Sequence, residues 1–369
     1  NLLEGVYLAP RAPTNTWNLW HQDHIDEFLN IIIQLAVLKE NVNPNKVYIL
    51  GYSAGGDGVY QLAPRMADRW AAASMMAGHP NEASPLGLRN NPFAIHVGAL
   101  DNPYNRNGKA EEWGIELDTL QANDGQGYIH DVKLHPGLGH WMNLQDAEAL
   151  PWMKNYERDP IPQKVVWKQD NVHHSNFYWV ETPRNEIISG GEIVAEYNSV
   201  LNEINIIENY SDTIKLLIND NMLDLDNPIT IKYQDTVIYN GRFHRTILNI
   251  YESLSVKGDS NLAFPCAALV RDNQTVFEEN VTLRISSPND FDKIRIYPNP
   301  FNNDINIDLP VQSVKESTIS ITNIQGKIIK QLKTESRNTK IDVSKLSNQI
   351  YVVKVENGEQ VFISKLVKY

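Results

Sequence analysis

A serine, an aspartate and a histidine that could form a hydrolytic triad follow one another in the first half of the chain. The serine lies in Gly51-Tyr52-Ser53-Ala54-Gly55-Gly56, directly after the apolar run Val47-Tyr48-Ile49-Leu50. A serine on a sharp turn between a buried strand and a helix is open to attack on a substrate, and small neighbours keep its hydroxyl accessible. We therefore predict that Ser53 is a nucleophile. The alternative is a glycine-rich turn that only packs a helix on a sheet or holds a phosphate.

The residue after this serine is the expected oxyanion donor. A helix N-terminus favours negative charge, and the backbone N–H of Ala54 would point at the oxygen that becomes charged. We assign Ala54 this role.

The acid is expected at the end of a later strand. Asp101 closes the apolar run that begins at Phe93, in Gly98-Ala99-Leu100-Asp101, which satisfies the chain order serine, acid, histidine. An ordinary turn aspartate before Asn102-Pro103 is the alternative. Asp118 and Asp124 have the character of helix and loop residues and are weaker candidates.

Two histidines follow the next predicted strand and could be the base. They lie in Leu134-His135-Pro136-Gly137-Leu138-Gly139-His140-Trp141-Met142, and their position in a loop does not choose between them. His140 lies on the glycine-containing part, where its side chain could reach Ser53. His135 precedes a proline, which favours fixed extended backbone. We predict His140 as the base.

Other polar and aromatic residues have weaker assignments. Adjacent histidines on a strand point to opposite faces, so His173 and His174 should not share a metal. His21 and His24 share a helical face, but the sequence offers no obvious third metal ligand for them. We predict neither a metal nor an organic cofactor. The residues that could line the substrate site are Trp17, Trp20, His79 and Trp141. Buried packing is the commoner role of tryptophan.

These residues need a sheet to bring them together. Apolar runs at 47–50, 72–76, 93–97 and 129–134, and a shorter one at 5–8, are expected to be strands. One helix is expected from His21 to Lys39. Another is expected to follow the turn that carries Ser53 and to reach about Leu62. Strands alternating with helices predict a mostly parallel sheet covered by helices, as in an α/β hydrolase.

The remainder of the chain has the pattern of β structure. Short alternating runs extend from about Lys164 to Leu283, with a turn expected at Tyr239-Asn240-Gly241 and a helix at 247–254. A further set of strands begins at Ile294, and Asn357-Gly358 predicts a hairpin. We expect a catalytic domain at 1–160, an accessory β domain at 161–285, a linker at 286–293 and an immunoglobulin-like β-sandwich at 294–369.

Composition excludes several classes of partner. The 369 residues carry a formal net charge of -12 without a lysine or arginine block, which argues against nucleic acid. The sequence contains no apolar run long enough to span a membrane. The single cysteine, Cys266, excludes an internal disulfide and is expected to be a small buried residue.

With these motifs in view, the first 160 residues resemble secreted α/β-hydrolases of the polyhydroxybutyrate-depolymerase-like and feruloyl-esterase-like groups, and also prolyl-oligopeptidase-like hydrolases. The residues that carry the resemblance are Gly51 to Gly56, Asp101 and Gly139-His140-Trp141-Met142. It implies hydrolysis of an ester or a peptide through an acyl-enzyme, and it supports His140 over His135.

The last 75 or so residues resemble the C-terminal sorting domain of the type IX secretion system. Three pieces occur in order: Ile296-Tyr297-Pro298-Asn299-Pro300-Phe301, Ile321 to Lys327, and Ile350 to Val355 followed by Lys365 to Lys368. The resemblance implies a Bacteroidetes-type bacterium, export through the periplasm to the cell surface or medium, and the type IX machinery as a partner of residues 294–369.

The resemblance to hydrolases also implies a central strand and a second oxyanion donor upstream of the first predicted helix, which this sequence does not supply. We therefore expect an N-terminally truncated fragment whose signal peptide and early strands lie upstream. The overall prediction is a secreted serine hydrolase acting on a small or polymeric ester, with a peptide bond as the less favoured choice of substrate. The alternative is a cell-surface glycan-binding protein built on a degenerate hydrolase scaffold.

Overall fold

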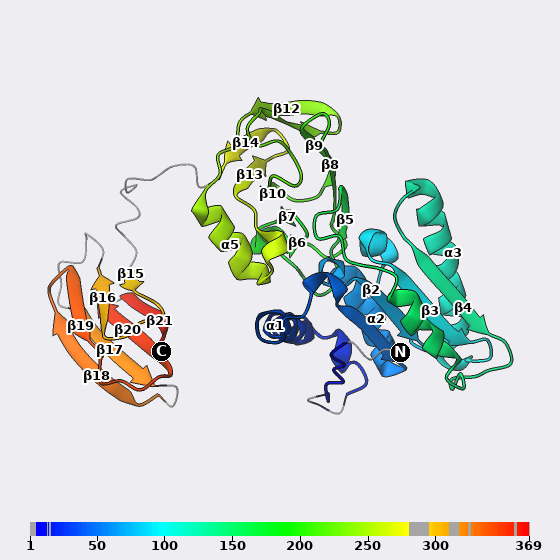
Figure 1. The fold of residues 1–369 in the computed structure, drawn as a ribbon, viewed down its shortest axis with the longest axis horizontal. Coiled ribbons are helices and arrows are strands. Elements are labelled where there is room, and N and C mark those ends of the chain that lie inside the picture. Colours follow the sequence, from blue (N-terminus) through cyan, green and yellow to red (C-terminus); the bar gives the residue numbers. More distant parts are fainter. Residues whose placement is uncertain are drawn as a thin grey trace. The chain divides into compact units, whose positions relative to one another are not determined.

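The computed structural model describes residues 5–12, 14, 16–279, 295–309, 317–323, 326–357 and 360–368. The chain divides into two compact units, Asn1–Val281 and Thr282–Tyr369 (Figure 1). The linker predicted at 286–293 lies outside the described residues.

The first unit opens with a parallel four-stranded sheet. Its strands lie in the order β1 (Tyr48–Tyr52), β2 (Ala72–Met76), β3 (Phe93–Gly98) and β4 (His130–His135), and every neighbouring pair is parallel. All residues of β2 and β3 are buried, which explains their continuous apolar sequence. The parallel sheet expected from the sequence is confirmed.

Helices flank the strands of this sheet along the chain. α1 (Asp23–Glu40) precedes β1, α2 (Ala54–Arg65) connects β1 to β2, α3 (Arg106–Asp124) connects β3 to β4, and α4 (Ala149–Met153) follows β4. Tyr60 of α2, Phe93 of β3 and Trp113 of α3 meet in one aromatic cluster, with ring centroids 4.5 to 5.9 Å apart. This cluster fixes the two helices against the middle of the sheet. Short 3-10 helices in the same unit are η1 (Leu19–His21), η2 (Pro44–Lys46), η3 (Ala67–Arg69), η4 (Pro85–Asn90), η5 (Pro103–Asn105), η6 (Gln145–Glu148), η7 (Arg184–Glu186) and η8 (Ser260–Leu262).

The middle region consists of two five-stranded sheets and one helix, α5 (Ile247–Lys257). One sheet has the order β14-β13-β10-β7-β6 and the other β12-β11-β9-β8-β5. Their shared core includes Trp167, Phe177 and Trp179. The strands are β5 (Lys164–Lys168), β6 (Asn176–Phe177), β7 (Val180–Glu181), β8 (Glu192–Asn198), β9 (Glu203–Asn209), β10 (Thr213–Ile218), β11 (Ile229–Tyr233), β12 (Thr236–Gly241), β13 (Cys266–Arg271) and β14 (Thr275–Glu278).

Two local predictions are wrong. Tyr239-Asn240-Gly241 is not a turn but the end of β12, and the chain turns instead at Gln234 and Asp235, whose φ angles are 46° and 62°. Pairing with β11 keeps the asparagine and glycine extended, so the ladder overrides their turn preference. Residues 5–8 form no strand, because they pair with none of the described strands, and their side chains are exposed.

The second unit is mainly β. One sheet has the order β15-β16-β19, with β15 (Arg295–Tyr297), β16 (Asp304–Asp308) and β19 (Asn338–Asp342). The other has the order β18-β17-β20-β21, with β17 (Ser317–Asn323), β18 (Ile328–Thr334), β20 (Ile350–Asn357) and β21 (Gln360–Val367). Side chains of both sheets, such as Ile305, Ile321 and Val353, share one core. β20 and β21 are antiparallel as predicted, and the Gly358 position of their turn lies outside the described residues.

Candidate active site

The nucleophile candidate lies on a strained turn between β1 and α2. Ser53 has φ 55° and ψ -120°, a conformation that costs a residue with a side chain on the order of 1–3 kcal/mol. Its backbone N–H donates to the carbonyl oxygen of Met76 at 2.9 Å, which ties the turn to β2. A Cβ on Gly51 would lie 2.1 Å from the carbonyl oxygen of Gly55, so only glycine fits where the strand meets the helix. The local structure is the elbow that the sequence predicted.

The fold brings the three candidate triad residues into one hydrogen-bonded chain. His140 Nδ1 lies 2.7 Å from Asp101 Oδ2, and His140 Nε2 lies 2.9 Å from Ser53 Oγ. A carboxylate only accepts hydrogen bonds, so Nδ1 of the neutral ring carries its hydrogen and Nε2 is left to accept from the serine hydroxyl. This tautomer is the one that can take a proton from a nucleophile.

The acid is more deeply buried than the base. Asp101 is fully buried at the end of β3, whereas the His140 side chain is 38% exposed. Arg106, in the first turn of α3, places a guanidinium nitrogen 3.6 Å from Asp101 Oδ1 and lies 4.8 Å from the centre of the Tyr104 ring. The arginine thus gives a positive neighbour to the Asp101 oxygen that does not face His140.

The loop after β4 is held in place by hydrogen bonds to its backbone and by contacts with the Tyr52 ring. Leu100 N donates to the Leu138 carbonyl at 2.8 Å, and Tyr52 Oη donates to the His140 carbonyl at 2.8 Å. The Tyr52 ring also lies 5.3 Å from the imidazole of His140 and 6.3 Å from the indole of Trp141. Tyr52 and Arg106 are contacts that the sequence analysis missed, although Tyr52 adjoins the serine in the motif itself.

The predicted oxyanion donor is the first residue of α2. The N–H groups of a helix's first turn have no acceptor within the helix, so the Ala54 N–H is available to a ligand next to Ser53. Its partial positive charge comes with that of the helix N-terminus.

The predicted substrate-lining residues are not all placed near the triad. Trp141 follows His140 and is 57% exposed beside Tyr52. Trp17 is 84% exposed, whereas Trp20 packs against Gly58 of α2. The His79 ring accepts a hydrogen bond from the backbone N–H of Asn81 at 2.9 Å, and the backbone N–H of His79 donates to Asp57 Oδ1 at 2.7 Å. Of these four residues, Trp141 is therefore the one that lies in the loop carrying His140.

His173 and His174 have hydrogen-bond partners of their own, and the cysteine is buried. His174 Nε2 bonds Asp26 at 2.7 Å, and His173 Nε2 bonds Ser189 at 2.9 Å. Among the described residues no group of three His, Cys, Asp or Glu side chains could hold a metal. Cys266 is buried, and burial raises the pKa of its thiol to about 12, so it is a poor nucleophile.

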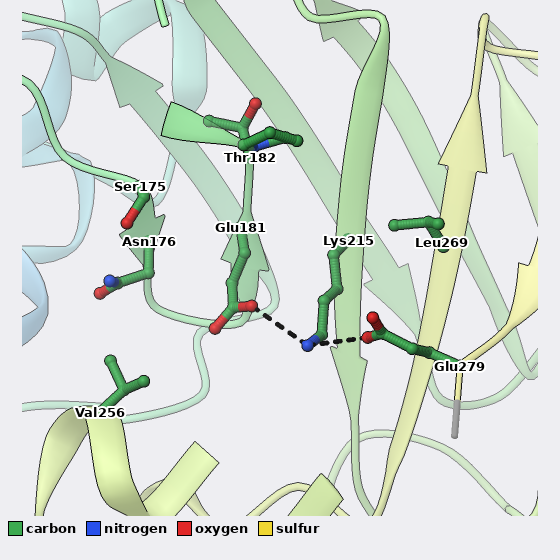
Figure 2. Close-up of a pocket in the computed structure, with 9 residues that line it drawn as sticks. Ser175, Asn176, Glu181, Thr182, Lys215, Val256, Leu269 and Glu279 are labelled. Atoms are coloured by element: carbon green, nitrogen blue, oxygen red, sulfur yellow. Dashed lines mark ion pairs between the residues drawn. The ribbon is translucent and has the colours of Figure 1, made fainter. Parts of the chain in front are cut away.

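A separate cavity of about 300 Å³ lies in the middle region (Figure 2). Lys215 Nζ lies in it between two carboxylates, 3.4 Å from Glu181 Oε2 and 2.8 Å from Glu279 Oε2. The other described lining residues are Ser175, Asn176, Thr182, Pro183, Val256 and Leu269. None of the nine is aromatic, so this cavity offers no ring on which a sugar could stack.

No curated protein matches the chain. Solved structures with partial similarity include a SOBER1 variant from Arabidopsis thaliana (19% identity, 36% of this chain and 63% of that one, TM-score 0.29) and the Bacillus cereus carboxylesterase (18%, 36% and 60%, 0.29). A thermostable esterase has 18% identity, with 38% of this chain and 39% of that one covered and a TM-score of 0.31. The chain thus spans less than two thirds of the length of each of these proteins.

One family accounts for the second unit. Residues 295–369 match the family described as the secretion system C-terminal sorting domain. The match covers the three sequence pieces noted above and the strands from β15 to β21. Among the described residues, no helix has both the length and the apolar character needed to cross a membrane. Residues 295–369 are therefore a type IX secretion system sorting domain, and the protein is exported to the cell surface or beyond.

Proposed function

We propose that residues 1–160 are the catalytic domain of a serine hydrolase that cleaves a carboxylic ester through an acyl-enzyme. The observation that carries this proposal is the hydrogen-bonded chain from Ser53 through His140 to the buried Asp101, on an elbow at the end of a parallel sheet. We further propose that residues 161–285 are an accessory β domain, and that the sorting domain is an immunoglobulin-like sandwich from a Bacteroidetes-type bacterium.

The reaction follows from the tautomer of His140. Ser53 Oγ attacks the acyl carbonyl while its proton passes to His140 Nε2, and Asp101 stabilises the imidazolium that forms. The Ala54 N–H donates to the oxyanion. The imidazolium then gives its proton to the leaving alkoxide, and water repeats the sequence to release the acid and free serine. The proton transfers pass through Ser53 and His140, and Ser53, His140 and Asp101 are hydrogen-bonded in series.

Labelling with a fluorophosphonate probe tests the nucleophile. The full chain should label covalently, and Ser53→Ala should not. Ser74→Ala is the matched control, because Ser74 is a fully buried serine of β2 whose hydroxyl has no hydrogen-bond partner within the described part of the chain, so its loss should leave labelling unchanged. Labelling that persists in Ser53→Ala, or folded protein that does not label, would contradict the proposal and favour a glycan-binding protein on an inactive scaffold.

Substrate class is tested on the same protein. We expect hydrolysis of p-nitrophenyl acetate that is lost in Ser53→Ala, and slower or absent cleavage of peptide p-nitroanilides. Faster cleavage of the peptide would assign the protein to the peptidase branch instead.

A further inference from the structure

Two buried histidines lie beneath the loops that carry Asp101 and His140. His96 is on β3, five residues before Asp101, and His135 is the last residue of β4, five residues before His140. Both are buried, at 0% and 5% exposure. Their rings are stacked, with centroids 5.4 Å apart and planes 21° from parallel. The pair joins the two strands just below the site.

The two rings and Gln145 form a directed chain of hydrogen bonds. His135 Nδ1 lies 3.2 Å from Gln145 Oε1, and His135 Nε2 lies 3.1 Å from His96 Nδ1. An amide oxygen only accepts, so His135 Nδ1 donates to it. In the neutral ring His135 Nε2 is then an acceptor, and His96 Nδ1 donates to it. The remaining His96 Nε2 is buried and has no hydrogen-bond partner among the described residues, and burial lowers the pKa of His96 to about 4, which agrees with a neutral His96 ring.

The bond between His135 and Gln145 closes the loop that carries His140. His135 is the residue before this loop, and Gln145 begins η6 directly after it. Met142 accepts a backbone bond from Gln145 at 3.0 Å, and Ala99 N donates to the His135 carbonyl at 2.9 Å. The base therefore projects from a loop whose two ends are joined by one side-chain bond, and that bond is anchored through His96 to the strand of the acid.

We propose that His135, with His96 and Gln145, is a positioning residue of the triad that keeps His140 within proton-transfer distance of Ser53. The inference rests on the proposed serine hydrolase function. His135 touches neither Ser53 nor the reacting atoms in this arrangement, and its effect passes through the loop. A displacement of about 1 Å at a catalytic group can cost on the order of 100-fold in rate.

Three substitutions of His135 separate its two hydrogen bonds. His135→Phe keeps a ring but loses both bonds, and we expect kcat for p-nitrophenyl acetate to fall about 10- to 100-fold with KM little changed, because proton transfer is affected and binding is not. Fluorophosphonate labelling should slow in parallel. His135→Asn keeps a donor near the Nδ1 position and should recover most of the rate. His135→Gln keeps a group near Nε2 instead and should not.

A second site tests the same bond without touching the core. Gln145 is exposed, so Gln145→Met should fold normally while removing the acceptor, whereas Gln145→Glu keeps one. We expect the first to lower kcat and the second to restore it. This pair keeps the inference testable even where His135→Phe fails to fold.

His130→Phe is the matched control on the same strand. His130 begins β4 at its other end, and its ring bonds Tyr128 and Asp118 at 2.7 and 3.2 Å. If His130→Phe lowers kcat as much as His135→Phe, or if Gln145→Met leaves kcat unchanged, the positioning role is wrong. If wild-type protein neither labels nor hydrolyses the ester, the proposed function fails first, so the two failures are distinguishable.

Discussion

At the scale of single residues, the candidate site depends on which groups are buried and which remain open. Asp101 is fully buried with one oxygen on His140, and the base is partly exposed between it and the serine. A buried carboxylate facing the imidazole stabilises the positive charge that forms during acyl transfer. Removing that charge should therefore affect the rate more than the fold.

Asp101→Asn is expected to lower kcat for p-nitrophenyl acetate by roughly 1,000- to 10,000-fold, because the neutral amide neither fixes the productive tautomer nor stabilises imidazolium. Steady-state kinetics measure the effect. Asp118→Asn is the matched control, since Asp118 also pairs with a histidine but lies exposed on α3. Equal losses in both variants would remove Asp101 from the triad.

The lowered pKa of His96 predicts that the free energy of unfolding depends on pH. Its folded pKa of about 4 lies below the usual value near 6.5, chiefly because of burial, with Asp131, Lys133, Glu148 and His135 as the charged or titratable neighbours. The unfolded chain then binds the additional proton, so this contribution is fully present above about pH 6.5 and is lost as pH falls toward 4. The difference corresponds to about 3 kcal/mol.

Urea unfolding followed by tryptophan fluorescence measures this effect in the first unit alone, because all eight tryptophans lie between Trp17 and Trp179. His96→Asn keeps a donor toward His135 but cannot titrate in this range. We expect its stability to depend less on pH between 6.5 and 4 than that of the wild type. Parallel profiles of the two proteins would show that His96 is not the linked group.

At the scale of secondary-structure elements, the site is made where two strand ends and their loops approach closely. A Cβ on Gly98, the last residue of β3, would lie 2.0 Å from the Gly139 carbonyl oxygen and 2.5 Å from that of Leu138. A Cβ on Gly139 itself would meet nothing within 4 Å. The loop that bears His140 can therefore lie against β3 only because position 98 has no side chain.

Gly98→Ala should push this loop outward, with a large loss of kcat and a lower urea midpoint, because the clash is with backbone that cannot rotate away. Gly139→Ala, in the same contact but on the open side, should change stability by less than about 1 kcal/mol. Comparing kcat and urea midpoints of the two variants checks the expectation. Similar behaviour of both variants would show that the loop is not in close contact with β3.

At the scale of the whole molecule, the middle β region and the parallel sheet of β1 to β4 belong to one compact unit. Asp68 of η3 forms an ion pair with Lys257 of α5, and Arg158 forms one with Asp259. Although burial by itself would raise the pKa of Asp68, Lys257 holds it below its usual value. Tyr178 Oη also donates to the Ala67 carbonyl at 3.0 Å inside the shared core. Breaking such buried pairs leaves uncompensated charge, which typically costs about 3–5 kcal/mol.

Truncation tests this dependence. A fragment of residues 1–160 should lose cooperative unfolding, because Asp68 and Arg158 lose their buried partners and Ala67 its packing. Residues 1–281 are the matched control and should unfold with the midpoint of the full chain. Tryptophan fluorescence in urea distinguishes the two, and a 1–160 fragment that unfolds cooperatively at the same midpoint would show that the regions are independent.

Much of the architecture follows from the sequence alone, because it is encoded in contiguous residues. The strand, turn and helix around Ser53 come from one short segment, and the predicted parallel sheet is confirmed. The sorting domain is recognisable from three short pieces of sequence, and the family match confirms it. The turn expected at 239–241 is wrong because pairing with a neighbouring strand outweighs local turn preference.

The sequence favoured His140 over His135 as the base, but only the tertiary structure shows what each of the two rings faces. His135 ends β4 and its ring faces His96, whereas His140 lies in the loop that follows, whose path brings it to Ser53, 87 residues away in sequence. The same is true of Arg106 beside Asp101 and of Lys257 beside Asp68. Such contacts depend on strand register and loop path, which arise from packing the whole unit and are not encoded in the spacing of any one segment.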